Sequence, residues 1–459
     1  MSEFNEFNEF NKIEDTSKKS GRVRTARNHS TQKAIRIILI VVICLAALSC
    51  VAFGALNYMG WLDAGREKAS RENETVIIDG KALTPATDED GNQLTDENGN
   101  LIYLDEDGNQ IVIRDEIYNF LLVGQDKKAM LTDVIMLINF DAKNGKIAIM
   151  QFPRDSFIKV SSKACMNCKY VPSGAQASSK CPECSSSLTT VGTGSGQKMN
   201  SVYNTYYSAL KKADSSTSEK ERTLFGMAGL ASEIERNLAI NIDYEVHMDL
   251  QGFRDIVDAI GGVQMNVPEN MYYTDPGQGL YINLKAGDQL LDGEKAEQFV
   301  RFRYGYVNGD LGRQDAQKLF MVAFFKNFKE KVSVTNVFSI LSSMMEHVTH
   351  TVPSSDLDYF GRQALGMDFN NITMFTAPNT PTYIGKASYV VLHRYALLDA
   401  VNNHFNLMAD KKISDYSFDP NRNFTVKNDS AINAIYETKA EFEGMKTAQD
   451  IEDNGIYIP

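Results

Sequence analysis

Positive charge is scarce in this sequence. The 459 residues include 47 lysines and arginines against 59 aspartates and glutamates, which gives a formal net charge of −12 at pH 7. Recognition of a nucleic-acid backbone depends on a surplus of basic residues, so this balance argues against a nucleic-acid partner. An anionic ligand must therefore be met by a local basic pocket. Hydrophobic residues make up 43% of the chain, enough for a substantial core, which excludes a disordered protein.

The chain also lacks the signatures of several enzyme classes. It contains no GxSxG nucleophile elbow and no P-loop, and its six histidines show no HExxH spacing. Serine hydrolases with such an elbow, P-loop NTPases and histidine-based metal catalysis therefore have no support. Cysteine is sparse as well. Of six cysteines, two lie in an apolar stretch and four in two CxxC pairs. This pattern argues against a framework of disulfides across the whole chain.

One long apolar run stands near the N-terminus. Residues 37–56 carry no charge, and a helix of that length matches the roughly 30 Å hydrocarbon layer of a bilayer. Basic residues dominate before the run, whereas the charges after it nearly cancel, so the positive-inside rule places the N-terminus in the cytoplasm. We predict a cytoplasmic tail over 1–36, a single transmembrane helix over 37–58 in the cell membrane, and an extracellular remainder. A cleaved signal peptide and a lipobox at Cys50 are the alternatives.

Residues 59–115 are polar and carry three copies of an acidic turn sequence. The copies begin at Asp88, Asp96 and Asp105, and each ends in Gly-Asn. Asp-Gly and Asn-Gly tolerate positive φ, so between short apolar runs they predict tight turns in a β-ribbon stalk. Calcium binding is the alternative, although the distal glutamate of an EF-hand loop is missing.

Strand and helix patterns are mixed in the rest of the chain. Apolar runs at 119–124, 133–140 and 146–152 predict strands, and helical periodicity appears at 219–238, 249–260 and 314–329. A helix near 335–347, a strand within 371–377 and a helix near 394–407 follow. This mixture predicts an α/β domain with a central sheet over 116–412. The C-terminal tail, 413–459, is polar and is expected to be irregular.

Arginines are grouped in a way that suits one anion. Residues 300–304 have strand character, and a period of two would place Arg301 and Arg303 on one face. Ten residues after Arg303, Arg313 and Gln317 share a helix face at i, i+4 spacing. Three converging arginines suit a pyrophosphate, because each guanidinium holds phosphate oxygens bidentately and stays charged. Pairing of each arginine with a surface carboxylate is the alternative.

A second polar group lies upstream, at the ends of the first strands. Asp126 follows the first apolar run, Asp133 opens the second, and Arg154 closes the hairpin that follows. Strand ends are where α/β proteins place ligands. Two carboxylates beside an arginine-held pyrophosphate are what Mg²⁺ or Mn²⁺ needs, because these hard cations prefer oxygen ligands. Taken alone, each aspartate is equally well explained as a turn residue or helix cap.

An insertion over 161–196 carries the two CxxC pairs, which are Cys165 with Cys168 and Cys181 with Cys184. Two such knuckles at this spacing predict a small zinc-ribbon-like unit, with Zn²⁺ held by four thiolates. Two disulfides are the alternative, since thiols usually oxidise outside the cell. The position of the insertion after Arg154 suggests a flap over the active site.

Several motifs in this order resemble those of the LytR-CpsA-Psr family. They read NFLLVGQD, LTDVIMLINF, FPRD, KMNSVYN, LLDGEKAEQFVRFRYG and GDLGRQDAQ, and the resemblance covers about 117–325, continuing more weakly to about 412. The 21-residue step from Asp133 to Arg154 and the ten-residue step from Arg303 to Arg313 fit the family pattern. The resemblance implies an α-β-α domain with a central mixed sheet and a hydrophobic groove for a lipid tail.

The resemblance also implies an extracytoplasmic phosphotransferase. Such an enzyme moves a glycopolymer, of teichoic acid or capsular polysaccharide type, from a polyprenyl-pyrophosphate carrier in the membrane to peptidoglycan. By position, Asp126 and Asp133 would hold Mg²⁺ (or Mn²⁺), and the pyrophosphate would be held by Arg154, Arg301, Arg303, Arg313 and Gln317. Catalysis would rest on Asp133, Arg154, Arg301 and Arg303.

Two features near the first aspartates depart from the family pattern. The loop from Asp126 to Asp133 is shorter than usual. Leu131 stands where the family usually has an arginine, and Lys127 or Lys128 would then supply the missing charge. Two other functions are compatible with the same fold. One is a wall- or polymer-binding protein with weak catalysis, and the other is a polyprenyl-pyrophosphate hydrolase in which water replaces the glycan acceptor.

Overall fold

The computed structural model describes residues 75–408 with gaps, and the short segments 434–435, 446–448 and 450–451. The gaps are 79–80, 127–129, 161, 173–178, 193, 195, 239, 278, 307–308, 332–347, 354–355, 357–358, 362 and 364–367. The predicted tail 1–36, transmembrane helix 37–58 and helix near 335–347 therefore lie outside the described residues, as do Lys127 and Lys128. Among the described helices, none is long and apolar enough to cross a membrane.

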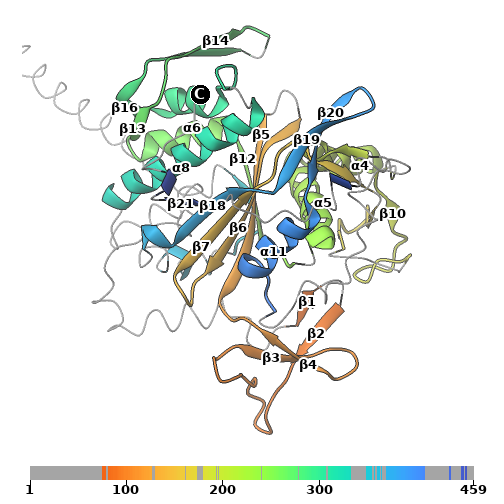
Figure 1. The fold of residues 1–459 in the computed structure, drawn as a ribbon. Coiled ribbons are helices and arrows are strands. Elements are labelled where there is room, and N and C mark those ends of the chain that lie inside the picture. The colour runs from red at the N-terminus through yellow and green to blue at the C-terminus, as the bar shows by residue number, and fades with distance from the viewer. Residues whose placement is uncertain are drawn as a thin grey trace, which may run out of the picture.

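A seven-stranded sheet forms the centre of the domain, in the order β17-β12-β5-β6-β7-β18-β21 (Figure 1). In that order the strands span Thr349–His350, Tyr244–Asp249, Ile117–Asp126, Leu131–Asp141, Lys146–Gln151, Ile372–Thr376 and Lys446–Thr447. β12 is parallel to β5 and β18 is parallel to β7, whereas the other neighbours are antiparallel. The sheet is therefore mixed, and the strands predicted from the apolar runs are confirmed as β5, β6 and β7.

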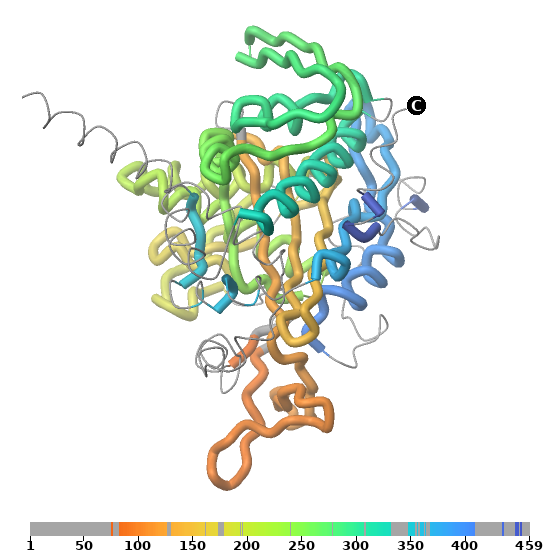
Figure 2. Tube along the Cα trace, turned by 90° about the vertical axis from the view of Figure 1, so that its left-hand side faces the viewer, coloured from red at the N-terminus to blue at the C-terminus, as the bar shows by residue number. Residues whose placement is uncertain are grey.

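Helices cover both faces of this sheet (Figures 1 and 2). One layer contains α6 (Leu250–Ala259), α7 (Gly293–Arg301) and α8 (Asp310–Lys331), and the other contains α4 (Val202–Ala213), α5 (Glu219–Leu238) and α11 (Arg394–His404). Because side chains alternate along a strand, β6 supplies both cores: Ile138 packs with the first layer, and Leu137 packs with the second. Burial on both faces explains why the central strands read as unbroken apolar runs.

Two hairpins extend from the first layer, between α6 and α7. β13 (Val263–Val267) pairs with β16 (Gly287–Leu291), and β14 (Met271–Asp275) pairs with β15 (Leu280–Leu284). A third hairpin, β19 (Asn379–Ile384) with β20 (Ala387–Leu392), follows β18. In Figure 1 the β14–β15 hairpin lies at the top, at the far end of the molecule from the stalk.

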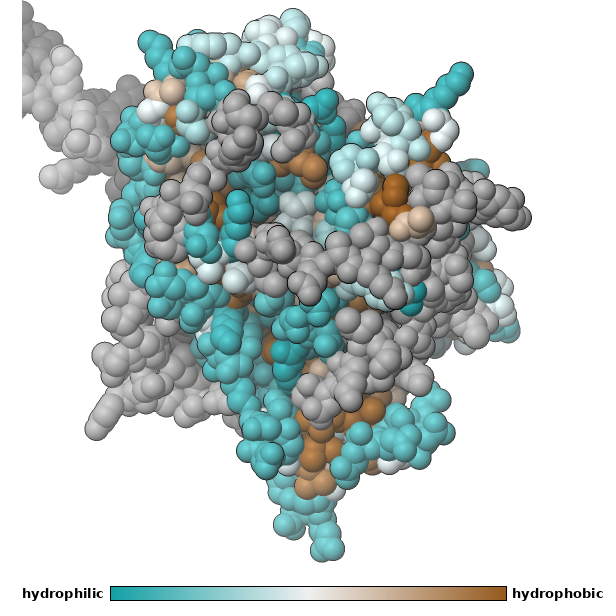
Figure 3. Space-filling model, in the orientation of Figure 1, coloured by the Kyte–Doolittle hydropathy of each residue, from teal (hydrophilic) through white to brown (hydrophobic). Residues whose placement is uncertain are grey.

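The predicted stalk folds as a four-stranded sheet of β1 (Val76–Ile78), β2 (Lys81–Pro85), β3 (Leu101–Leu104) and β4 (Gln110–Ile113). The acidic repeats form three matching turns. In the third turn, for example, the Asp105 carboxylate accepts hydrogen bonds from the backbone N–H groups of Asp107 and Asn109 at 3.0 and 2.8 Å. The glycines of the repeats have φ of 87°, 73° and 81°, which confirms the turn interpretation. The space-filling view shows an apolar patch on this stalk between hydrophilic residues (Figure 3).

The prediction of an irregular C-terminal tail is wrong for residues 446–451. β21 pairs with β18 at the edge of the central sheet, with Thr447 opposite Thr373. Ala448 and Ile451 are buried in the first core. Two apolar side chains in a polar segment were too weak a pattern to predict this strand, which is specified by the open sheet edge beside it.

Candidate functional site

A cavity of about 300 Å³ lies between the central sheet and the layer of α6, α7 and α8. Charged and polar residues from separate elements line it, namely Gln125, Asp133, Arg154, Asp249, Asp275, Arg301, Arg303, Arg313 and Gln317. Buried apolar residues line it too, including Leu122, Met136, Phe320, Met321 and Phe324. The cavity therefore brings together every arginine that the sequence predicted, and it joins them to an apolar interior.

Arg301 and Arg303 reach the cavity by a different route from the one predicted. Residues 300–304 are not a strand: Arg301 is the last residue of α7, and Phe302 leaves the helix with φ −61° and ψ 134°. That extended backbone produces the expected alternation locally, because Phe302 is buried while the residues on either side line the cavity. The strand-like pattern was the end of an amphipathic helix followed by one extended residue.

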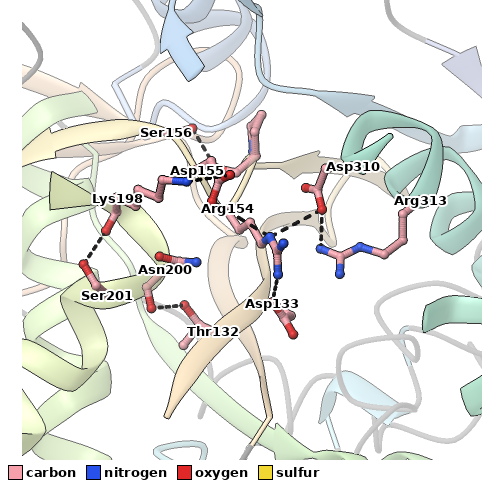
Figure 4. Close-up of polar contacts among 11 residues, drawn as sticks. Thr132, Asp133, Arg154, Asp155, Ser156, Lys198, Asn200, Ser201, Asp310 and Arg313 are labelled. Atoms are coloured by element: carbon pink, nitrogen blue, oxygen red, sulfur yellow. Dashed lines mark hydrogen bonds and ion pairs between the residues drawn. The ribbon is translucent and has the colours of Figure 1, made fainter. Parts of the chain in front are cut away.

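Arg154 lies among three carboxylates (Figure 4). Its Nη1 contacts Oδ1 of Asp133 at 2.5 Å, its Nε is 3.4 Å from Oδ1 of Asp310, and Asp155 lies at 3.9 Å. Burial alone would lower the pKa of Arg154, but the attraction of Asp310, Asp133 and Asp155 outweighs it and raises that pKa. Arg154 is thus a fixed positive charge at the junction of β6, β7 and α8.

Asp310 is a site residue to which the sequence analysis assigned no role. It begins α8, and its Oδ1 lies 2.8 Å from Nη2 of Arg313 as well as facing Arg154. One carboxylate therefore separates two guanidinium groups that would otherwise repel each other. Its partner Arg154 stands 156 positions earlier in the chain, so local spacing carried no signal of the contact.

Arg313 is buried, yet its hydrogen-bonding capacity is incompletely used. Nε and Nη2 have no hydrogen-bond partner among the described residues, because the short Nη2 contact with Asp310 lacks hydrogen-bond geometry. Burial lowers the pKa of Arg313, and the charge of Asp310 opposes this effect. An arginine remains charged at neutral pH even so. A buried cation with unpaired donors facing a cavity is suited to an anionic ligand.

Gln317 lines the cavity, but its amide already has protein partners. Its Oε1 accepts a hydrogen bond from Gln151 at 2.6 Å, and its Nε2 donates to the carbonyl of Val300 at 3.2 Å. Gln317 therefore connects α8 to β7 and to the end of α7, next to Arg301. Contact with a head group stays a prediction for this residue, whereas its positioning of α7 follows from the hydrogen bonds.

Glu297 holds the side chain of Arg301 from within α7. Its Oε1 lies 2.7 Å from Nη1 of Arg301, and its Oε2 lies 2.8 Å from Nη1 of Arg254 on α6. Arg303, by contrast, is exposed, and its side chain has no hydrogen bond or ion pair with another described residue. Its backbone carbonyl accepts a hydrogen bond from the N–H of Tyr306 at 3.2 Å. It is the arginine of the cavity that is most accessible to a ligand.

A set of polar contacts that the sequence did not predict holds the loop that carries Arg154. Lys198, at the end of β11 (Gly196–Lys198), contacts Oδ2 of Asp155 at 2.9 Å. The backbone N–H of Asn200 donates to the carbonyl of Arg154 at 2.9 Å, and Thr132 donates to the carbonyl of Asn200 (Figure 4). The segment KMN thus fixes the loop that carries Arg154.

The predicted carboxylate pair can be placed only in part. Asp133 lies within β6 and lines the cavity, and Oδ2 of its carboxylate has no hydrogen bond or ion pair with another described residue. Asp126 is the last residue of β5, opposite Leu131 in the register, and its side chain lies outside the described part of the structure. One carboxylate oxygen of Asp133 is therefore available to a ligand. The metal-binding role of Asp126 remains a prediction.

The four cysteines of the insertion converge on one point, so they could hold a metal ion. Their Sγ atoms all lie within 4.8 Å of one another. Cys165 is 3.5 Å from Cys184 and Cys168 is 3.4 Å from Cys181, and none of the four is in a disulfide. Within each knuckle, the residue after the second cysteine has positive φ, 66° at Lys169 and 60° at Ser185. The two CxxC turns are thus alike in backbone and in the direction of their thiols.

The interpretation of the insertion as a flap is not supported. None of the described residues of 161–196 lines the cavity. Ala164 and Val191 instead pack in the second core, and Ser162 donates a hydrogen bond to Glu233 of α5 at 2.6 Å. The insertion therefore lies on the opposite face of the sheet from the cavity. Its stems, β8 (Phe157–Lys159) and β11, pair with each other and adjoin the Arg154 loop.

Known proteins resemble this chain over most of its described part. The profile of the LytR_cpsA_psr family matches residues 87–406, beginning inside the predicted stalk. A polyisoprenyl-teichoic acid–peptidoglycan teichoic acid transferase TagU from Bacillus mycoides is 24% identical over 252 residues, 53% of this chain and 64% of that protein. TagU of Enterococcus faecalis is 29% identical over 148 residues, 32% of this chain and 45% of that protein. The chain thus spans less than two thirds of the length of these relatives.

Solved structures are similar at lower sequence identity. The crystal structure of TagV from B. subtilis is 18% identical, with a TM-score of 0.46, and the likeness covers 63% of this chain and 97% of that one. The structure of TagT bound to LIIa-WTA is also 18% identical, with a TM-score of 0.42, and covers 63% of this chain and 89% of that one.

The unpaired donors of Arg313 predict a response to inorganic pyrophosphate. Because the anion would bind the folded state alone, it should raise the free energy of unfolding of the full chain, by about 2.7 kcal/mol at a hundredfold excess over Kd. The thermal-unfolding midpoint should rise with it. Arg313→Lys should weaken binding about tenfold or more, since an ammonium group lacks the planar fork. Calorimetry at several pyrophosphate concentrations measures both effects.

Arg222→Lys is the matched control, because Arg222 lies on α5, on the far face of the sheet, and contacts Thr217 and Ser215. It should respond as the parent does. The same dependence on pyrophosphate in all three proteins would contradict the role given to Arg313.

Proposed function

Because the chain belongs to the LytR-CpsA-Psr family, whose profile matches residues 87–406, we propose that it transfers a glycopolymer from a polyprenyl-pyrophosphate carrier to peptidoglycan. The TagU relatives are named as transferases that join teichoic acid to peptidoglycan. The proposed donor is accordingly of teichoic acid type, with capsular polysaccharide as the other candidate. Water as acceptor would make the same site a hydrolase.

One stripe of α8 carries this proposal. Arg313, Gln317, Phe320 and Phe324 follow one another at i, i+4, i+7 and i+11, and all four line the cavity. A single helix face thus begins with a guanidinium group and continues with aromatic rings. A lipid pyrophosphate has the same order of chemistry, since its charged head group is bonded to a hydrocarbon chain. Burial of that chain would contribute about 0.8 kcal/mol for each CH₂ group removed from water.

In the proposed reaction, the oxygen of a peptidoglycan hydroxyl attacks the phosphorus that carries the glycan. The bond from that phosphorus to the polyprenyl phosphate breaks, and polyprenyl phosphate leaves with the electron pair. The hydroxyl proton passes to a base, for which Asp133 and Asp310 are the carboxylates nearest Arg154. Arg154, Arg301, Arg303 and Arg313 would hold both phosphates and neutralise the charge that develops on the leaving group.

A divalent cation fits this site through Asp133. Mg²⁺ typically takes one or two carboxylates together with substrate phosphate oxygens. Asp133 lines the cavity, and only one of its two oxygens is engaged by Arg154. We propose that Asp133, with Asp126 from the end of β5, holds Mg²⁺ or Mn²⁺. When bound, the ion would add positive charge beside the pyrophosphate.

A lipid carrier requires that the domain work at a membrane surface. The predicted transmembrane helix 37–58 would supply the anchor, with the N-terminus in the cytoplasm and the catalytic domain outside the cell. The stalk of β1–β4 would then join the anchor to the domain. This topology is part of the proposal.

For the four-cysteine site we propose a structural Zn²⁺ ion. Four thiolates at about 2.3 Å from zinc in a tetrahedron are ~3.8 Å apart. The two short Sγ–Sγ distances of 3.5 and 3.4 Å, with every pair within 4.8 Å, fit that arrangement after small adjustments. Hydrogen bonds from Ser186 lower the pKa of Cys184, whereas desolvation raises the pKa of Cys168, so in the absence of a metal the proton of this group of thiols stays on Cys168. Bound metal would displace that proton, because the ligand is the thiolate. A zinc ion here would join the two CxxC turns of the insertion.

The transfer reaction itself can be measured. We expect the purified chain, given a short polyprenyl-pyrophosphate-linked glycan, Mg²⁺ and peptidoglycan fragments, to attach the glycan to the fragments. Arg301→Ala should reduce attachment at least a hundredfold, the scale of removing one group that stabilises developing charge. Arg222→Ala, remote from the cavity, should keep the parent rate. Mass spectrometry of the fragments follows the product.

Other outcomes of this assay separate the alternatives. Release of polyprenyl phosphate without attachment would identify a hydrolase. Binding of the lipid without release would mean that the fold serves recognition of the polymer, and it would overturn the proposed transferase.

The metal proposal predicts about one zinc ion per chain by elemental analysis after purification without oxygen. Cys181→Ser should remove most of the zinc, because Cys181 is buried and its replacement leaves three thiolates. Ser187→Ala, in the same knuckle region, should retain it. A protein with no zinc and no free thiol at these four positions would show that they form disulfides instead.

A further inference from the structure

Two stacked tyrosines stand beside the arginines of the cavity. Tyr273 comes from β14 and Tyr304 from the turn after α7, and their ring centroids are 4.2 Å apart with 15° between the planes. Both residues line the cavity. Tyr304 is 68% exposed, although large aromatic side chains are usually covered. Packing of the core therefore does not account for this ring.

Charged groups surround the stacked pair. The guanidinium of Arg303, the residue before Tyr304, lies 5.9 Å from the centroid of the Tyr304 ring. Asp275 follows Tyr273 by two positions on β14, so both side chains lie on the same face of that strand, and both line the cavity. The exposed aromatic surface thus has a cation on one side and a carboxylate nearby.

Stacking fixes the orientation of this surface in advance. A lone exposed tyrosine samples several rotamers, whereas a ring stacked on a second ring loses little further entropy when a ligand packs against it. Two exposed tyrosines of the β14–β15 hairpin, Tyr272 and Tyr281, do not line the cavity. Among the described tyrosines, Tyr273 and Tyr304 line the cavity together with its arginines, whereas Tyr272 and Tyr281 lie on the outside of the hairpin.

We propose that Tyr304, held by Tyr273, forms a saccharide subsite next to the pyrophosphate. A sugar ring has one face of C–H bonds, which suits the negative face of an aromatic ring, and a rim of hydroxyls, which suits Arg303 and Asp275. The subsite rests on the proposed function, because the sugar must be joined to, or must attack, the phosphate that the arginines hold. Tyr304 would then determine which sugar is accepted.

The saccharide could belong to the donor or to the acceptor. A donor sugar is bonded to the pyrophosphate itself, so its contact with Tyr304 would add to the affinity of the lipid-linked ligand. An acceptor sugar belongs to a peptidoglycan fragment that binds separately. Both share the chemistry that the tyrosines recognise, and the experiment distinguishes them.

The test uses calorimetric binding to the full chain with three probes. These are farnesyl pyrophosphate, farnesyl pyrophosphate that carries one hexose on the second phosphate, and a soluble peptidoglycan disaccharide. We expect Tyr304→Ala to weaken binding of one sugar-bearing probe by about three- to tenfold, the scale of one aromatic contact. Binding of farnesyl pyrophosphate should be unchanged. Tyr304→Phe should retain the parent affinities, because it keeps the ring.

Tyr281→Ala is the matched control, since Tyr281 is exposed to a similar extent as Tyr304 and lies on the hairpin that carries Tyr273. Selective loss for the hexose-bearing lipid assigns the subsite to the donor, and selective loss for the disaccharide assigns it to the acceptor. The proposal is overturned if Tyr304→Ala binds both sugar-bearing probes as the parent does, or if it weakens all three probes equally. A parent protein that does not bind farnesyl pyrophosphate would contradict the proposed function instead, and the disaccharide would then decide the subsite alone.

Discussion

The contact of Asp310 with both Arg154 and Arg313 is the interaction on which the cavity depends. Four arginines line one cavity of about 300 Å³. Like charges that are this crowded repel one another strongly where water is excluded. Asp310 separates two of them, Asp133 pairs with Arg154, and Glu297 holds Arg301. The carboxylates reduce the repulsion, but Nε and Nη2 of Arg313 have no hydrogen-bond partner among the described residues, and Arg303 is exposed. The positive groups are thus prepared for an anion.

The rest of the fold serves to bring these charges together beside an apolar space. Arg154 follows β7, Arg301 and Arg303 lie at the end of α7, and Arg313 lies in the first turns of α8. Gln317 joins the three elements through its hydrogen bonds with Gln151 and Val300. The same helix that carries Arg313 supplies Phe320 and Phe324 two and three turns later, so the step from charge to hydrocarbon is built into one element. This continuity is why we propose a lipid-linked anion, rather than a free one, as the ligand of the cavity.

Much of the fold could be predicted from the sequence, because strong local patterns carry it. The unbroken apolar runs of β5, β6 and β7 reflect a sheet that is covered on both faces, and the CxxC pairs already implied that four thiols converge. The site was predicted where residues recur at fixed spacing, as with Arg313 and Gln317. The contacts of Asp310 with Arg154 and of Lys198 with Asp155 were missed because the partners are distant in the chain and no spacing marks such contacts. The i, i+3 spacing of Asp310 and Arg313 was a local signal that the sequence did offer. Residues 300–304 misled for another reason, since the end of an amphipathic helix followed by one extended residue has the same alternation as a strand. β21 was missed because the open edge of the sheet, rather than its own sequence, specifies it.

We propose that one cavity accommodates both the pyrophosphate and the beginning of its hydrocarbon chain. Binding constants for a series of pyrophosphate esters with one, two, three and more isoprene units test it most directly. If the claim is correct, affinity rises with each unit while buried hydrocarbon increases, by about 0.8 kcal/mol per CH₂ at most, and becomes constant once the cavity is full. If all members bind as inorganic pyrophosphate does, the apolar lining is only part of the core and the account of the cavity is wrong.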